Sequence, residues 1–268
     1  MHNDPCVGIM DPKVVQAMCT THNVSFDKHP IVLNLIVQLF GGGILFSQTD
    51  AVWRKRRTAI APAFYKGKLV NLVELAKSCV HETHQRWKKL CANGKTRIDF
   101  MEEVSMMHVK ILMSCAFGTD ISDRLIDYET EGKVEKKNVA FVIRTVFHDC
   151  INRLADPHIV MFPFLATWHI TPYERRLLRN CERLREFILS VVQSRRAAIK
   201  AGNDGGADLL GILLKDENFH NDDRAIVDEC LTFFFAGSQT SSEAAQNLIL
   251  MLIKHPEIKQ KILNELDS

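Results

Sequence analysis

Hydrophobic residues along the chain recur mostly every three to four positions, which is the spacing of amphipathic helices. Long stretches of this kind run from about Gly67 to Leu90, from Pro172 to about Lys200, and from about Asp223 to Lys254. The middle of the last stretch, Leu231–Gly237, is apolar on all sides, as in a helix that is surrounded by protein. The pattern predicts a mainly α fold with a long central helix and little or no sheet.

Helix ends are marked by capping residues. Asp99 with Glu102 three positions later predicts a helix start, and Gly118 its end. Thr171-Pro172 followed by Glu174 is the clearest start in the chain. Shorter helices are expected from Asp11-Pro12 to about Thr20 and from Thr49 or Asp50 to about Pro62.

Two further expectations concern less regular segments. Residues Val134–Leu154 have a helical pattern, and strand-like alternation is limited to a few residues around Thr96–Phe100. The apolar segment Ile31–Phe46 is interrupted by Gly41–Gly43, so a helix, a flexible loop and a short return are expected there.

Composition narrows the class of protein. Glycine (13) and proline (8) are scarce in the 268 residues, which favours long helices. The formal net charge is only +2, so no overall field favours nucleic acid, and no nucleic-acid partner is predicted. The eight cysteines are scattered without a C-x-x-C pair, as in reduced proteins. No apolar run reaches the ~18 residues of a membrane span.

The segment around Gly237 is chemically distinctive. Thr232, Ala236 and Thr240 follow one another at intervals of four, so one stripe of the central helix is small and partly hydroxylated. A helical glycine and a threonine that bonds back onto the helix predict a local bulge. Such a groove admits a flat cofactor edge or a diatomic ligand; the alternative is close packing of helices over small residues.

A second distinctive segment is Trp53–Arg57. Trp53 and Arg57 are four positions apart on one helix face, so an indole N–H and a guanidinium can converge on one carboxylate. The alternative interpretations are a solvated basic face and a localisation signal.

These segments, with Pro62-Ala63-Phe64 between them and Lys254-His255-Pro256-Glu257 after them, resemble the cytochrome P-450 haem-thiolate monooxygenases. The resemblance is greatest to their microsomal fatty-acid-hydroxylase-like branch. It runs from the family's helix B to its helix J, so residues 1–268 are interpreted as one partial cytochrome P-450 domain.

The resemblance implies roles for individual residues. Trp53 and Arg57 match the pair that hydrogen-bonds a haem propionate. Ala236 and Gly237 match the part of helix I that passes over the distal haem face. Thr240 matches the threonine that hydrogen-bonds dioxygen and helps to deliver protons for O–O cleavage.

Substrate contacts are implied at Ile44, in the Gly42–Phe46 loop, and at Thr232 and Phe235 of helix I. Gln239 stands where the family usually has an aspartate or glutamate. An amide can orient a water molecule but cannot relay a proton, so slower or leakier oxygen activation, or a non-hydroxylating reaction, is expected in a complete protein.

The family's activity is the insertion of one atom of dioxygen into a lipophilic organic substrate, with haem as cofactor and electrons from NADPH through a reductase. The resemblance implies an endoplasmic reticulum membrane location on the cytoplasmic face, with membrane contact through the F–G region, here Ile159–Trp168. The basic residues Arg54, Lys55 and Arg56 would form the docking face for the electron donor.

Two family elements are not recognised in the chain: the E-x-x-R helix, and the loop whose cysteine thiolate ligates iron. No metal ligand is therefore assigned. A truncated, catalytically inactive fragment with weak or no haem binding is the alternative to an enzyme. A third interpretation, an unrelated helical ligand-binding protein, requires the motif match to be accidental.

Overall fold

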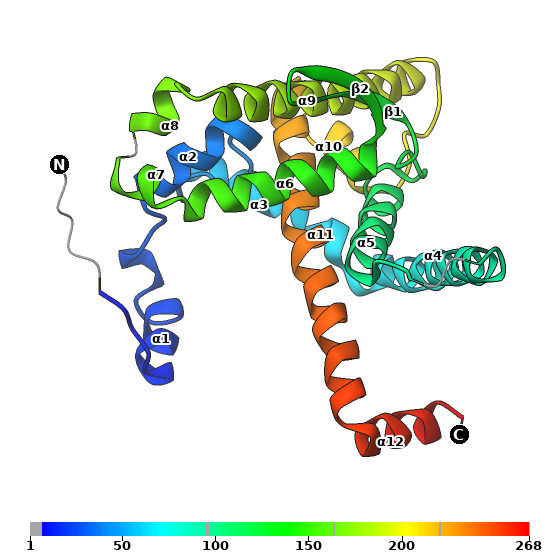
Figure 1. Cartoon of the computed structure of the whole chain (residues 1–268). Coiled ribbons are helices and arrows are strands. Elements are labelled where there is room, and N and C mark those ends of the chain that lie inside the picture. Colours follow the sequence, from blue (N-terminus) through cyan, green and yellow to red (C-terminus); the bar gives the residue numbers. More distant parts are fainter. Residues whose placement is uncertain (1–6, 95–96, 163, 220, 268) are drawn as a thin grey trace.

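The computed structural model describes residues 7–94, 97–162, 164–219 and 221–267. It is mainly α-helical, and the 32-residue helix α11 (Asp223–Lys254) crosses the whole molecule (Figure 1). The strands of the described residues are β1 (Leu125–Thr130) and β2 (Lys133–Asn138), which form one small sheet. The predicted fold class is confirmed.

The N-terminal part of the chain is a series of short helices. Asp11 accepts a hydrogen bond from the Lys13 N–H, and Asp50 accepts one from the Trp53 N–H, so both predicted helix starts carry a side-chain cap. The elements are α1 (Pro12–Cys19), the 3₁₀ turn η1 (Asn23–Ser25), α2 (Pro30–Phe40), α3 (Ala51–Ile60) and the 3₁₀ turn η2 (Ala61–Phe64).

The longer helices begin and end close to the predicted positions. Asp99 caps Glu102 N, Gly118 ends the same helix in the left-handed region at φ 65°, and Thr171 caps Glu174 N. The remaining helices are α4 (Lys66–Ala92), α5 (Phe100–Phe117), α6 (Val139–Ala155), α7 (Pro157–Met161), α8 (Phe164–Trp168), α9 (Pro172–Lys200), α10 (Leu209–Lys215) and α12 (Pro256–Leu266).

The β-hairpin corrects the prediction for residues 134–154. The first five of these residues belong to β2, which pairs antiparallel with β1 from Leu125 opposite Asn138 to Thr130 opposite Lys133. Glu131 and Gly132 both have positive φ, at 46° and 80°, as tight hairpin turns require. Residues 97–99 form no strand, and Thr96 lies outside the described residues.

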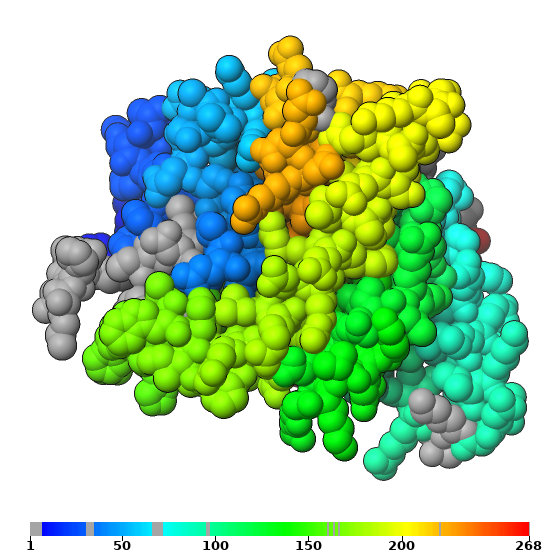
Figure 2. Space-filling view, turned by 90° about the horizontal axis from the view of Figure 1, so that it is seen from above, coloured from blue at the N-terminus to red at the C-terminus, as the bar shows by residue number. Residues whose placement is uncertain are grey.

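The core lies where α5, α6, α9 and α10 surround the first half of α11. Leu231 and Phe234 of α11 are buried, and Phe234 packs edge-on against Phe117 of α5. Seen from above, the orange start of α11 lies against the yellow-green chain of α9 (Figure 2). The second half of α11 leaves this shell, so Leu248, at 56%, and Ile253, at 72%, are exposed.

A buried ion pair joins three helices behind the core. The Arg153 guanidinium of α6 donates through Nε to both carboxylate oxygens of Glu174 on α9, at 3.0 and 2.9 Å. It also donates to the Leu35 carbonyl of α2 at 2.5 Å. The Arg153 side chain is fully buried and that of Glu174 is 5% exposed. This pair fixes α2, which leads into the Gly41–Ser47 loop.

Candidate functional site

A cavity of about 560 Å³ lies between the first half of α11, α5, α10, α3 and the loop that precedes α3. Its lining brings together segments that are far apart in the chain, from Lys28 to Ser241. Among the lining residues are those that the sequence assigned to the site, Gln239 and Phe235 excepted: Ile44, Trp53, Arg57, Thr232, Ala236, Gly237 and Thr240.

The stripe of small residues on α11 forms one wall. Thr232, Ala236 and Thr240 all face the cavity, as their spacing predicts. The Thr240 hydroxyl donates to the Ala236 carbonyl at 2.6 Å, yet α11 stays α-helical throughout, so the expected bulge is absent. At Gly237 a Cβ atom would lie 2.9 Å from Leu112 Cδ2 of α5. Close helix packing therefore explains this glycine, while Ala236 and Thr240 remain open to the cavity.

Phe235 and Gln239 lie outside the lining. The Phe235 ring packs against Phe40, Phe46 and Phe147, with centroids 5.1 to 5.6 Å apart. The Gln239 amide donates to Glu243 one turn further along the helix. The neighbouring Phe233, which the sequence did not single out, lines the cavity and packs on Phe64 at 5.0 Å.

One corner of the cavity is cationic. The Arg57 guanidinium lies 5.4 Å from the Trp53 ring centroid, and the Lys28 ammonium lies 4.9 Å from it. Lys28 also donates to the Ser47 carbonyl at 2.5 Å, and burial lowers the pKa of Lys28. Sequence reasoning missed Lys28 because it stands in a loop 25 residues before Trp53. Two cations on one indole form a site for carboxylates.

The expected convergence of Trp53 and Arg57 on a single acceptor does not describe this structure. The Trp53 indole N–H donates to the Ile44 carbonyl at 2.7 Å, while Arg57 stacks on the indole face. The two side chains share a helix face as predicted, but the indole donor is already engaged by the wall of the cavity.

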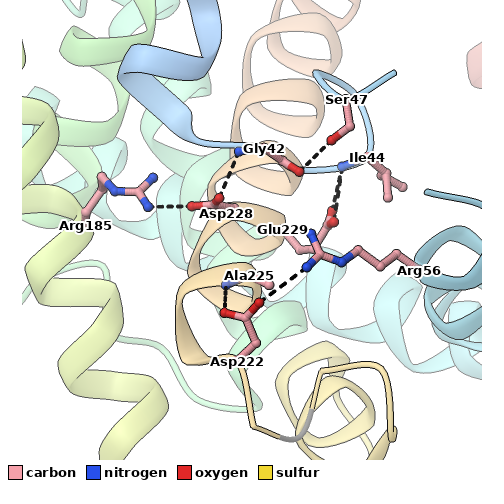
Figure 3. A network of polar contacts seen from close by, with 9 residues as sticks. All are labelled: Gly42, Ile44, Ser47, Arg56, Arg185, Asp222, Ala225, Asp228 and Glu229. Carbon is pink, nitrogen blue, oxygen red and sulfur yellow. Dashed lines mark hydrogen bonds and ion pairs between the residues drawn. The ribbon is translucent and has the colours of Figure 1, made fainter. Parts of the chain in front are cut away.

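Two acidic side chains of α11 border the loop at the cavity's edge, and the sequence did not identify either. Asp228 accepts from the Gly42 N–H at 2.8 Å, and Glu229 accepts from the Ile44 N–H at 3.0 and 3.1 Å (Figure 3). Glu229 is 3% exposed, and burial raises the pKa of Glu229 to about 7. The sequence offered one indication of this pair, since two adjacent acidic residues stand in an otherwise mostly apolar helical stretch.

The lining fits a flat, mostly apolar group that carries carboxylates at one edge. The cationic corner matches carboxylates, the α11 stripe leaves room beside it, and the buried Thr232 hydroxyl has no hydrogen-bond partner in the described structure. Cys115 also lines the cavity, but burial raises the pKa of its thiol. Among the described residues, no three His, Cys, Asp or Glu side chains gather as a metal site requires.

The described helices include none with the length and apolar character that crossing a membrane takes. The most exposed apolar residues outside α11 and α12 include Met161, at 70%, and Trp168, at 66%, of the α7–α8 segment.

Several curated proteins are similar to this chain over almost all of its length. Secologanin synthase 1 of Catharanthus roseus is 25% identical over 275 residues, which are 97% of this chain and 49% of that protein. Cytochrome P450 4F8 of Homo sapiens is 24% identical over 284 residues, 98% of this chain and 51% of that protein. Cytochrome P450 4F6 of Rattus norvegicus is 22% identical over 276 residues. The chain spans about half the length of these relatives.

The family model for cytochrome P450 matches residues 1–268, so the similarity covers the helices and the residues that line the cavity. The chain belongs to the cytochrome P450 family.

Proposed function

We propose that this chain is the distal-side part of a haem-dependent monooxygenase that inserts one atom of dioxygen into a lipophilic organic substrate. One observation carries the proposal: the cationic corner at Trp53 and the small-residue stripe at Thr240 line the same cavity. A macrocycle with carboxylates at one edge and an open face elsewhere needs both features at once. Residues 1–268 would act as a single partial domain.

The residues of the cationic corner would hold the haem carboxylates. Arg57 and Lys28 supply the charge, and Trp53 supplies an indole N–H once it leaves the Ile44 carbonyl. Bound there, haem would supply the iron centre at which dioxygen is activated. Ile44 and Thr232 would contact substrate. Phe235 does not line the cavity and would influence substrate binding indirectly, because it packs on Phe46 of the loop that carries Ile44.

Thr240 and Gln239 would manage protons and water. The Thr240 hydroxyl proton is bonded to the Ala236 carbonyl, so the oxygen keeps its lone pairs available toward the cavity. Gln239 carries no titratable proton, and its amide would orient a water molecule at most. The slower or leakier oxygen activation expected from the sequence remains a proposal.

The axial thiolate is proposed to come from none of the described cysteines. Cys115 is the cysteine that borders the cavity, and burial raises the pKa of its thiol, which disfavours the thiolate form that iron binds. The similarity to P450 4F proteins supports membership of the microsomal fatty-acid-hydroxylase-like branch.

Partners and location follow from exposed residues. Arg54 and Lys55 are exposed on α3 and would dock a reductase that carries electrons from NADPH, whereas Arg56 is partly buried against Asp222. The exposed apolar residues of α7 and α8, including Met161, Phe164 and Trp168, would contact the membrane surface. We propose the cytoplasmic face of the endoplasmic reticulum for the whole protein.

The test is haem binding by the purified chain, followed by difference absorption spectroscopy. Saturation at one haem per chain is expected, and Arg57→Leu should weaken binding about tenfold, as loss of a charged hydrogen bond does. Lys55→Leu on the same helix is the matched control and should leave binding unchanged. Equal effects of the two substitutions, or no saturable binding, would refute the proposal and favour the inactive fragment.

A second measurement addresses the iron ligand. After reduction and addition of carbon monoxide, the spectrum should lack the absorption band that is characteristic of thiolate ligation. Appearance of that band would show that a cysteine of this chain ligates iron.

A further inference from the structure

The Gly41–Ser47 loop is attached to α11 through its backbone. The Gly42 and Ile44 N–H groups donate to the Asp228 and Glu229 carboxylates (Figure 3). Two glycines permit the close approach: a Cβ at Gly41 would lie 2.1 Å from Asp228 Oδ1, and a Cβ at Gly43 would lie 2.0 Å from Thr232 Oγ1. The position of the loop therefore depends on the hydrogen bonds that the Asp228 and Glu229 carboxyls accept from its backbone.

The two carboxyls differ in their counter-ions. Asp228 is paired with Arg185 of α9 at 2.5 Å. Arg56 of α3 lies beside Glu229 but forms its ion pair with Asp222, at 3.4 Å. In the part of the chain that the structure describes, no cation lies within ion-pair distance of Glu229. The titratable and charged groups around it are Arg56 from α3, Arg185 from α9 behind Asp228, Asp222 at the N-cap of α11, Asp228 and Cys230 of α11, and, across the cavity, Lys28 and Arg57.

Burial without a counter-ion decides the charge state of Glu229. Burial raises its pKa from the ordinary 4.5 to about 7, against the smaller opposing effects of the Ile44 N–H and Arg56. If the loop leaves and water enters, the carboxyl returns toward its ordinary pKa. The attached loop therefore favours the protonated form, in which one oxygen still accepts from Ile44, and ionisation above about pH 7 favours detachment.

Ile44 is the point at which this attachment reaches the cavity. Its side chain lines the cavity, its N–H is bound by Glu229, and its carbonyl accepts from Trp53. We propose that Glu229 is a positioning residue that fixes the cavity wall through the Ile44 backbone, so that the shape of the cavity responds to the ionisation of this one carboxyl. The identity of the ligand in the cavity rests on the proposed function. The attachment of the Gly41–Ser47 loop to Glu229 does not rest on it.

Hydrogen exchange of the whole chain tests the proposal, with segment 42–46 followed by mass spectrometry between pH 6 and pH 8.5 and protection corrected for the intrinsic pH dependence. Wild-type protection should fall by up to about tenfold across this range, because a full return of the pKa from about 7 to 4.5 gives about 300-fold over all pH, of which about 30-fold has already occurred at pH 6. Glu229→Gln mimics the protonated form and should give a flat profile. Glu103→Gln, a carboxyl of α5 away from the loop, is the control and should keep the wild-type fall.

A second pair of variants covers the case in which Glu229→Gln does not fold. Arg56 lowers the pKa of Glu229 because a neighbouring cation favours the ionised form. Arg56→Met removes this cation and raises the pKa, so the midpoint of the fall should move to higher pH. Lys55→Met on the same helix should leave the midpoint unchanged. A flat wild-type profile, or a pH-dependent fall that persists in Glu229→Gln, would overturn the proposal.

The outcome is separable from that of the haem experiment, because exchange is measured without haem. Loss of haem binding with an intact exchange profile counts against the proposed function alone. A flat exchange profile with intact haem binding counts against the role of Glu229 alone.

Discussion

Replacing Arg153 with methionine removes the guanidinium of the buried pair from the Glu174 carboxylate, which is 5% exposed and keeps the His169 ring 3.8 Å away. Breaking a buried pair from one side costs about 3–5 kcal/mol, because an uncompensated charge stays in the interior. Loss of the Arg153 hydrogen bond should cost less at the Leu35 carbonyl than at Glu174, because this carbonyl is uncharged and lies within helix α2. Against a net stability of about 5–15 kcal/mol, Arg153→Met should remove roughly a fifth or more of the free energy of unfolding.

The double variant Arg153→Met/Glu174→Leu isolates the cause. With both charges gone, the interior holds no unpaired ion, and the cost should fall to near zero. Lys77→Met is the control for an exposed pair: Lys77 and Glu74 lie 2.8 Å apart but are 68% and 69% exposed, so less than about 0.5 kcal/mol is expected.

Urea unfolding followed by circular dichroism at pH 7 measures all three variants. The reasoning fails if Arg153→Met shifts the unfolding free energy no more than Lys77→Met, or if the double variant is as unstable as Arg153→Met.

Three further predictions concern the cavity and use the same unfolding measurement. Thr232→Val should stabilise the fold by about 1 kcal/mol, because the buried hydroxyl has no partner, whereas Thr83→Val, whose hydroxyl donates to Cys79 at 2.8 Å, should not. Gly43→Ala should cost about 1–3 kcal/mol through its clash with Thr232, while Gly42→Ala, with 3.8 Å to its nearest neighbour, should be tolerated. Burial raises the pKa of Glu229 from 4.5 to about 7, so its stabilising contribution should be complete below about pH 4.5 and lost as the pH rises through 7. Over this range the difference in unfolding free energy between wild type and Glu229→Gln should change by about 3 kcal/mol. A difference that does not depend on pH would contradict this.

The helices could be predicted because their boundaries depend on local contacts. Asp99 and Thr171 bond N–H groups three positions away, and Gly118 ends its helix by its own φ angle. The hairpin could not, because Lys133–Asn138 is mostly charged and exposed and pairs only with β1. What fixes β1 is a distant side chain: Asn180 of α9 bonds the Glu129 N–H and carbonyl at 2.9 and 3.0 Å.

The site was predictable to the extent that helical spacing determines it. Thr232, Ala236 and Thr240 share a face because they are four apart, and so do Trp53 and Arg57. Lys28 and Glu229 were missed because their neighbours come from other parts of the chain. A buried acid without a counter-ion can be recognised only when the distances to the surrounding cations are known.

The bond from Trp53 to the Ile44 carbonyl has a thermodynamic consequence. An indole carries a single N–H, so it cannot fully serve both this carbonyl and an incoming carboxylate. A carboxylate that accepts a hydrogen bond from the indole must therefore compete with the Ile44 carbonyl. The factor by which the bond to Ile44 is strengthened is then the factor by which the affinity for that carboxylate falls. The affinity for the cofactor and the affinity for a substrate in the cavity, usually measured as separate properties, would then depend on the same equilibrium.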